Sequence, residues 1–369
     1  MLATRLRFLE AFFGGMDKMW QTHKNVSMSA FLLLLMHFFI IPDSGNLPRG
    51  KPLGMLSWMG IVILILITIA PHVPVISRFL NLAYQKWRIA HKLLGVFFIV
   101  GLAHYFLVDT ISKQTIPGSY MLIFSVIGII AYVYRQFFSR RFELYHEYMV
   151  EKINLLNGTC VELLLKPKHK PVSFQAGQFV YIYSKDDPKL REPHPFTVSS
   201  SPKDDTLRLT IKGSGDWTGY IQKNLKPNSV VALLGGFGMF NYKDGGKDQI
   251  WIAGGIGVTP FLSWIRDLNN KPDVNVDFFY NVHCEADALF LDEFQALAEK
   301  HTNFRVHVHS ALKDGHLSAQ QITKLSNGNI ANKHFYLCGP VGMTEGFAKK
   351  FQTMGVPASQ IHYEEFNFR

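Results

Sequence analysis

The sequence predicts three domains: a helical bundle that spans a membrane, an antiparallel β-barrel, and an α/β domain with a parallel sheet. Three observations predict this multidomain fold. Apolar residues concentrate in four long runs between residues 27 and 138. Short strands punctuated by glycine and proline follow them. From residue 249 onward, strands alternate with helices, which is typical of a doubly wound, Rossmann-like sheet. The expected domains are residues 1–141, 142–245 and 246–369.

The four apolar runs are each close to the roughly 20 residues that a spanning helix needs. They lie at residues 26–42, 55–69, 91–108 and 120–138. Basic residues gather before the first run, between the second and third, and after the fourth, which is the positive-inside pattern of cytoplasmic loops. We therefore expect an integral protein of a bacterial inner membrane or its equivalent, in contact with membrane lipid, with residues 142–369 in the cytoplasm.

The net charge of +10 does not indicate a nucleic-acid partner, because no basic helix with groove-reading geometry accompanies it. The three cysteines, Cys160, Cys284 and Cys338, form no CxxC pair and all follow the last apolar run. Their placement fits a reducing cytoplasm.

Four histidines lie in or beside two of the apolar runs. His23 and His37 are 14 residues apart, and His91 and His104 are 13 apart. A spacing of 14 places two imidazoles on one helix face, about 21 Å apart. A spacing of 13 misses one face by roughly 140°, so we expect the second helix to be bent or locally rewound. Ionisable groups are costly inside apolar helices, which favours ligation of two haem irons over a packing role. His23 would pair with His91, and His37 with His104.

Two motifs in the barrel region have residue types suited to a flavin. In His194-Pro195-Phe196-Thr197, an aromatic ring and a hydroxyl can pack on an isoalloxazine edge, and Thr197 is the candidate hydrogen-bond donor. Gly215-Asp216-Trp217-Thr218 follows Lys212, and a helix from about Thr218 would present free N–H groups to a pyrophosphate. The alternatives are a plain edge strand for the first motif and a common turn for the second.

Two further motifs follow predicted strands of the α/β region. Gly254-Gly255-Ile256-Gly257-Val258-Thr259-Pro260 comes after an apolar strand and opens a helix, which is the context that a dinucleotide phosphate loop requires. Pro260 suits the first turn of that helix. Cys338-Gly339-Pro340 follows a later strand. Two such motifs in one chain favour a nicotinamide dinucleotide site over ordinary turns.

Taken in order, these motifs resemble those of the ferric reductase and NADPH oxidase family of transmembrane haem proteins. The pair H-x13-H and H-x12-H, the HPFT flavin motif, the GGxGxTP loop and the terminal residues 363–369 carry the resemblance. The family's bundle usually has six helices, and this sequence begins where the third would be. The resemblance therefore implies a bacterial-type member without the first two helices.

The resemblance also implies the cofactors and the reaction. FAD, NAD(P)H and two b-type haems are expected, with Cys338 and Gly339 flanking the nicotinamide and Phe366 stacking on the flavin. Thr197, Cys338 and Phe366 are the expected catalytic residues. Electrons would pass from NAD(P)H through FAD and both haems to dioxygen, giving superoxide. The first alternative acceptor is a ferric chelate, and the second alternative is a haem-binding module that serves a partner protein. Neither the choice between NADH and NADPH nor the oligomeric state follows from these residues.

Overall fold

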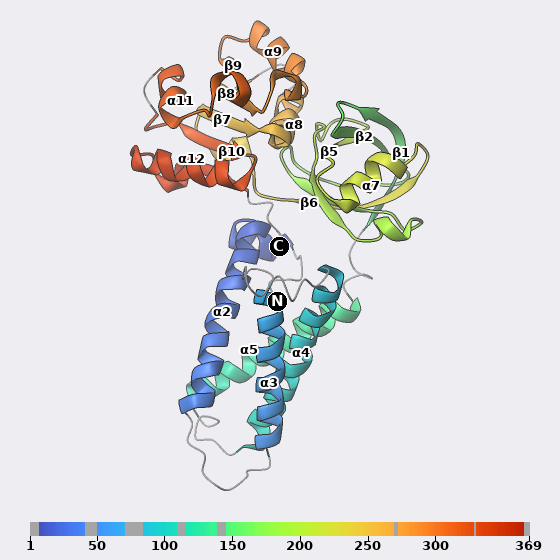
Figure 1. The fold of residues 1–369 in the computed structure, drawn as a ribbon, viewed down its shortest axis with the longest axis vertical. Helices are drawn as coiled ribbons and strands as arrows, with labels where there is room; N and C mark the ends of the chain where they lie inside the picture. The colour runs from blue at the N-terminus through green and yellow to red at the C-terminus, as the bar shows by residue number, and fades with distance from the viewer. Residues whose placement is uncertain are drawn as a thin grey trace. The chain divides into compact units, whose positions relative to one another are not determined.

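The structure, a computed structural model, describes residues 7–40, 50–70, 84–108, 115–138, 145–268, 272–327 and 330–364. The chain divides into two compact units. We call residues 20–142, with 1–5, the helical unit, and residues 6–19 with 143–369 the sheet unit. Figure 1 shows the elements of both units.

Four long helices make up most of the helical unit (Figure 1). They are α2 (Met16–Ile40), α3 (Lys51–Ile69), α4 (Tyr84–Leu107) and α5 (Ile116–Val133), the last continued by a π-helical turn at Tyr134–Phe138. All four are long and apolar enough to cross a membrane. The four helices predicted from the apolar runs are therefore confirmed.

Small residues let α3, α4 and α5 approach one another closely. A Cβ atom on Gly60 would collide with the ring of Phe97, and one on Gly95 would collide with the ring of Tyr132. Beside the first contact, the Ser57 hydroxyl donates a hydrogen bond to the Phe97 carbonyl at 2.8 Å. Close packing at glycine and serine is typical of helices that associate within lipid.

The first part of the sheet unit is an antiparallel sheet in the order β4-β3-β6-β1-β2-β5. Its strands are β1 (His146–Leu155), β2 (Cys160–Pro167), β3 (Phe179–Tyr183), β4 (His194–Thr197), β5 (Leu207–Lys212) and β6 (Val230–Phe237). A bridge between Val198 and Leu209 joins the β4 edge to the β5 edge, which closes the sheet into a barrel. Helix α7 (Asp216–Asn224) follows β5. The predicted barrel strands are confirmed.

The second part is a parallel sheet in the order β11-β10-β7-β8-β9. Its strands are β7 (Asp248–Gly254), β8 (Asn275–Val282), β9 (Phe304–Ser310), β10 (His334–Cys338) and β11 (Ile361–Tyr363). One apolar cluster joins a sheet face to α8 (Thr259–Asp267) and α9 (Leu291–Lys300). Another joins the opposite face to α11 (Ala319–Leu325) and α12 (Val341–Thr353), and α10 (Ala311–Asp314) is a single turn. The strand order reverses at β7, which is where such sheets bind ligands.

The residues before the first long helix, together with the first four residues of that helix, belong to the sheet unit. We expected residues 1–141 to form one domain, whereas residues 6–19 pack with residues 143–369. This segment includes α1 (Arg7–Phe13) and buries three apolar side chains, those of Leu9, Met16 and Met19. The Glu10 carboxylate is also buried, and its Oε1 accepts a hydrogen bond from the Gly238 N–H at 2.7 Å.

Candidate functional site

The two flavin motifs meet through Trp217. Its indole stacks on the His194 ring, with centroids 4.3 Å apart, and on the Phe196 ring, with centroids 5.6 Å apart. The indole N–H of Trp217 is buried and has no hydrogen-bond partner among the described residues. A buried donor without a partner is costly, so this atom fits contact with a bound polar group such as FAD. Strand β4 and helix α7 thus come together at Trp217.

The turn before α7 differs from the expected phosphate cradle. The helix begins at Asp216, two residues earlier than expected. The N–H groups of Ser214 and Gly215 donate to the Thr218 hydroxyl at 3.0 and 2.9 Å. The Trp217 N–H donates to the Asp216 carboxylate at 2.8 Å. These three N–H groups are therefore not free, because side chains in the first helical turn fold back and cap them.

Thr197 is the last residue of β4 and is buried, opposite Phe179 of β3. Lys212 is the last residue of β5 and is exposed. The predicted roles of both in flavin binding stay predictions.

The glycine-rich loop has the predicted strand–loop–helix geometry. Gly254 ends β7, Gly255–Val258 form a 3-10 turn, and α8 begins at Thr259 with Pro260 in its first turn. Gly255 has a φ of +53°, a conformation that favours glycine. The loop therefore lies at the carboxyl end of the central strand, where the phosphates of a dinucleotide bind in sheets of this kind.

The second nicotinamide motif lies against this loop, because β10 is the parallel neighbour of β7 and pairs Cys338 with Ala253. A Cβ atom on Gly257 would collide with the Cys338 carbonyl. A Cβ atom on Gly339 would lie 2.9 Å from the Gly254 Cα. The contact therefore requires glycine at these positions, and the structure brings both nicotinamide motifs together.

A carboxylate that the sequence analysis missed lies near Cys338. Burial raises the pKa of the Cys338 thiol, and the negative charge of Glu364 raises it further, so the thiol is neutral at pH 7. Oε1 of Glu364 accepts a hydrogen bond from the Met239 N–H at 2.9 Å. Glu364 follows β11, and its position in the terminal motif was the one available signal. Phe366 lies outside the described residues.

In the helical unit, the structure brings together the first predicted histidine pair. The rings of His23 and His91 have centroids 6.3 Å apart. Two imidazoles that ligate one metal through bonds of about 2 Å have centroids roughly 6 Å apart, so the pair fits a shared metal. Nδ1 of His91 is buried and has no hydrogen-bond partner among the described residues. Trp87 packs beside His91, with ring centroids 5.2 Å apart.

The second predicted histidine pair is not brought together. Helix α4 is α-helical from Tyr84 to Leu107, without the local rewinding that we expected, so His104 lies on a different face from His91. His104 instead faces α3, and its Nδ1 donates a hydrogen bond to the Gly50 carbonyl at 2.9 Å. Within the described helices, no ring contact joins His37 to His104. The neighbouring Phe38 stacks on Trp58 of α3, with centroids 4.0 Å apart.

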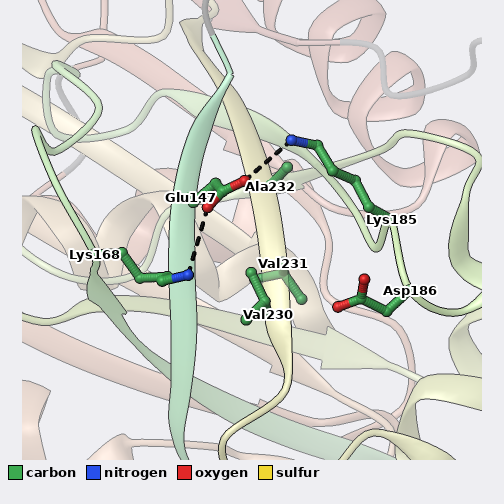
Figure 2. A pocket seen from close by; sticks show the side chains of 7 residues that line it. All are labelled: Glu147, Lys168, Lys185, Asp186, Val230, Val231 and Ala232. Atoms are coloured by element: carbon green, nitrogen blue, oxygen red, sulfur yellow. Dashed lines mark hydrogen bonds and ion pairs between the residues drawn. The ribbon is translucent and has the colours of Figure 1, made fainter.

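A pocket on the barrel is separate from all of these motifs (Figure 2). Glu147, in its wall, forms ion pairs with Lys185 at 3.1 Å and with Lys168 at 3.5 Å. Hydrogen bonding and charge from Lys185, with a smaller effect of Lys168, lower the pKa of the Glu147 carboxyl. Because these charges satisfy one another and no predicted site residue lines the pocket, it is not the candidate site.

Two family models match the sheet unit. Residues 145–281 match an FAD-binding domain, and residues 251–349 match an oxidoreductase NAD-binding domain. Flavohemoprotein B of Dictyostelium discoideum is 26% identical over 188 residues, which cover 46% of this chain and 44% of that protein. The reductase component of propane 2-monooxygenase from Rhodococcus jostii is 24% identical over 232 residues, which cover 59% and 62%. The chain thus spans less than two thirds of either relative.

Solved structures share the fold of the sheet unit. The FAD/NAD-binding domain of a nitric oxide dioxygenase from Vibrio cholerae aligns with a TM-score of 0.51 at 22% identity, covering 60% of this chain and 98% of that one. A ferredoxin NADP+ reductase from Neisseria gonorrhoeae, with bound FAD and NADP, aligns with a TM-score of 0.53 at 18% identity and the same coverage. Residues 145–349 therefore match an FAD-binding domain and an oxidoreductase NAD-binding domain in turn, and they share their fold with these solved structures.

Proposed function

We propose that the chain is a membrane-bound oxidoreductase that moves electrons from cytoplasmic NAD(P)H, by way of FAD and haem, to dioxygen on the far side. The observation that carries this proposal is the neighbouring pair His23 and His91. That pair lies in a unit of membrane-length helices, and the same chain holds an FAD- and NAD-binding module. The resemblance to ferric reductases and NADPH oxidases supports the same proposal.

FAD, when bound, accepts electrons in pairs from a nicotinamide and releases them singly. The residues of this chain prepare the approach of that nicotinamide. Gly255 leaves the backbone open at the carboxyl end of β7, because a Cβ atom there would meet nothing within 4 Å, so a dinucleotide can come close. The buried, neutral Cys338 thiol adds no charge beside the reacting atoms. Glu364 supplies the nearby carboxylate, held in place by the Met239 N–H.

Haem, when bound, supplies one-electron transfer. His23 and His91 would hold one haem by ligating its iron. For the second haem, the hydrogen bond from His104 Nδ1 to the Gly50 carbonyl leaves the other ring nitrogen available to a metal. The partnership of His104 with His37 rests on the histidine spacing and on the resemblance.

A second candidate function is the reduction of a separate partner protein by the FAD-binding and NAD-binding module. The likeness to the reductase component of propane 2-monooxygenase favours it. So does the likeness to a component of the Na+-translocating NADH-quinone reductase from Neisseria meningitidis. In that case the helical unit would serve as an anchor.

The test uses the full chain, purified in detergent and supplied with haem and FAD. NADPH and NADH are added separately, and haem absorbance, superoxide and Fe(II) formation from a ferric chelate are recorded. We expect low-spin haem that is reduced only when both FAD and nicotinamide are present, together with superoxide. Formation of Fe(II) without superoxide would show that the electron acceptor is the ferric chelate and not dioxygen. Flavin reduction in a chain that binds no haem would contradict the proposal and favour the second candidate.

A further inference from the structure

Helix α8 links the nicotinamide loop to the flavin barrel through its polar side chains. Its first residue, Thr259, belongs to the glycine-rich loop. Further along, four of its residues form hydrogen bonds with the barrel: Ser263, Trp264, Arg266 and Asp267. Their partners lie in two loops, at residues 176–177 before β3 and at residues 199–201 after β4.

Ser263 bridges the two barrel loops. Its hydroxyl is fully buried and donates to the Ser200 carbonyl at 2.7 Å. The same oxygen accepts a hydrogen bond from the Gly177 N–H at 3.3 Å. Replacing this hydroxyl would therefore leave two buried backbone groups without a partner, which is costly for each of them.

Arg266 binds both parts of the sheet unit at once. Its Nε and Nη2 donate to the Glu293 carboxylate of α9 at 2.9 and 2.6 Å. Its Nη1 donates to the Ser199 carbonyl of the barrel at 2.8 Å, and Glu162 of β2 lies 3.8 Å from the same nitrogen. The guanidinium is planar and its donors point in fixed directions, so these bonds determine the distance between α8 and the end of β4.

The hydrogen bonds of Ser263 and Arg266 connect the glycine-rich loop to the flavin motif through only a few residues. Ser199 and Ser200 follow Thr197, the candidate flavin donor, within three residues. Ser263 lies one helical turn beyond Thr259, and Arg266 lies nearly one turn further. Any shift of α8 along the barrel would therefore move the nicotinamide loop relative to the flavin motif.

We propose that Ser263 and Arg266 are positioning residues that set the distance between the nicotinamide loop and the flavin-binding strand. This inference rests on the proposed reaction, in which NAD(P)H loses a hydride to become NAD(P)+ and the flavin gains it. Reacting atoms must come within about 3–3.5 Å, and a misplacement of about 1 Å can slow a reaction roughly 100-fold. Neither side chain needs to touch a cofactor, because each acts through the backbone of residues 199–200.

The test compares Arg266→Gln and Ser263→Ala with a matched control, Ser184→Ala, in the full chain. Ser184 is also a buried serine, and its hydroxyl donates to the Val230 carbonyl and accepts from the Asp186 N–H, each at 3.3 Å. All of its partners lie within the barrel. Stopped-flow flavin reduction over a range of NADPH concentrations gives the limiting rate and the nicotinamide affinity, and deuterated NADPH gives the isotope effect.

We expect the limiting rate to fall about 10- to 100-fold in Arg266→Gln and several-fold in Ser263→Ala, with a larger isotope effect. FAD content and nicotinamide affinity should stay within about twofold of the parent. Without any cofactor, hydrogen exchange at residues 176–177 and 199–201 should accelerate in Ser263→Ala. It should stay unchanged there in Ser184→Ala.

Unchanged limiting rates in both variants would overturn the inference while leaving the reaction intact. An equal loss of rate in Ser184→Ala would also overturn it, because general destabilisation would then explain the result. If NADPH does not reduce the flavin of the parent chain, the proposed function itself is refuted, and the positioning role with it.

Discussion

The two units place their apolar side chains in opposite environments. In the sheet unit, large side chains such as Trp251, Trp264 and Phe278 are completely buried. In the helical unit, side chains of the same kind, such as Leu33 and Phe39, are 64% and 76% exposed. A packed core holds the sheet-unit site in place without its ligands, whereas the proposed function would surround the helical unit with lipid and place a metal between its histidines. The two units should therefore respond differently to substitutions at their sites.

The largest expected effect is the loss of haem on replacing His91 by alanine in the helical unit. In the proposed function His91 and His23 hold haem iron together, so this variant should lose low-spin haem, and transfer to dioxygen should fall below detection. NADPH should still reduce the flavin at the parent rate, because the sheet unit is unchanged. Reduced-minus-oxidised spectra and stopped-flow flavin absorbance measure the two effects.

The control is His169→Ala, which removes an exposed histidine from the barrel and should change neither measurement. Full haem retention after His91→Ala would remove the main support for metal binding in the helical unit.

The next effect concerns the contact between the nicotinamide motifs. In Gly257→Ala, the new methyl group would collide with the Cys338 carbonyl, and neither backbone can shift without disturbing β7 or β10. We expect flavin reduction by NADPH to slow on the order of 100-fold with FAD still bound. Gly346→Ala is the control, because a Cβ at that α12 position meets nothing within 4 Å. Equal behaviour of the two variants would show that the close contact has no functional role.

A smaller effect is expected from Glu364→Gln, which keeps the shape of the side chain and removes its charge. The amide oxygen can still accept from the Met239 N–H, so folding should be unaffected. We expect the hydride-transfer rate to fall about 10-fold if the carboxylate acts near the reacting atoms. A parent-like rate would make Glu364 purely structural.

The smallest effect is a change of stability with pH. Burial, the neighbouring His334 and Lys18 lower the pKa of His362 to about 4. The folded state therefore binds fewer protons than the unfolded state below the ordinary histidine pKa of about 6.5. Stability should be fully present above pH 6.5 and decrease by about 2 kcal/mol as the pH falls towards 4. Thermal unfolding of the full chain between pH 7 and 4.5 should show a smaller decrease for His362→Gln than for the parent. If the stabilities of the parent and of His362→Gln decrease in parallel with falling pH, the assignment of this effect to His362 is contradicted.

The sequence predicted the motifs whose residues are contiguous. The loop from Gly254 to Pro260 could be predicted because an apolar strand precedes it and its glycines have a clear physical purpose. Glu364, Ser263 and Arg266 could not, because their partners come from distant segments that only tertiary packing brings together.

The histidine spacing had a similar limit. Our expectation of local rewinding in α4 came from assuming that His91 and His104 share a face. The structure instead keeps the helix regular and turns His104 towards Gly50. A spacing along one helix does not determine which neighbouring helix each side chain meets.

Residues 6–19 belong to the sheet unit, and this has a practical consequence for protein expression. A soluble fragment cut at residue 143 would keep the motifs from His194 to Glu364, yet it would lose α1. Removing the three buried side chains would expose the apolar groups that they cover. The Gly238 N–H would also lose its hydrogen-bond acceptor, the Glu10 carboxylate. A circularly permuted or linker-joined version that restores residues 6–19 should therefore be more soluble than the simple fragment.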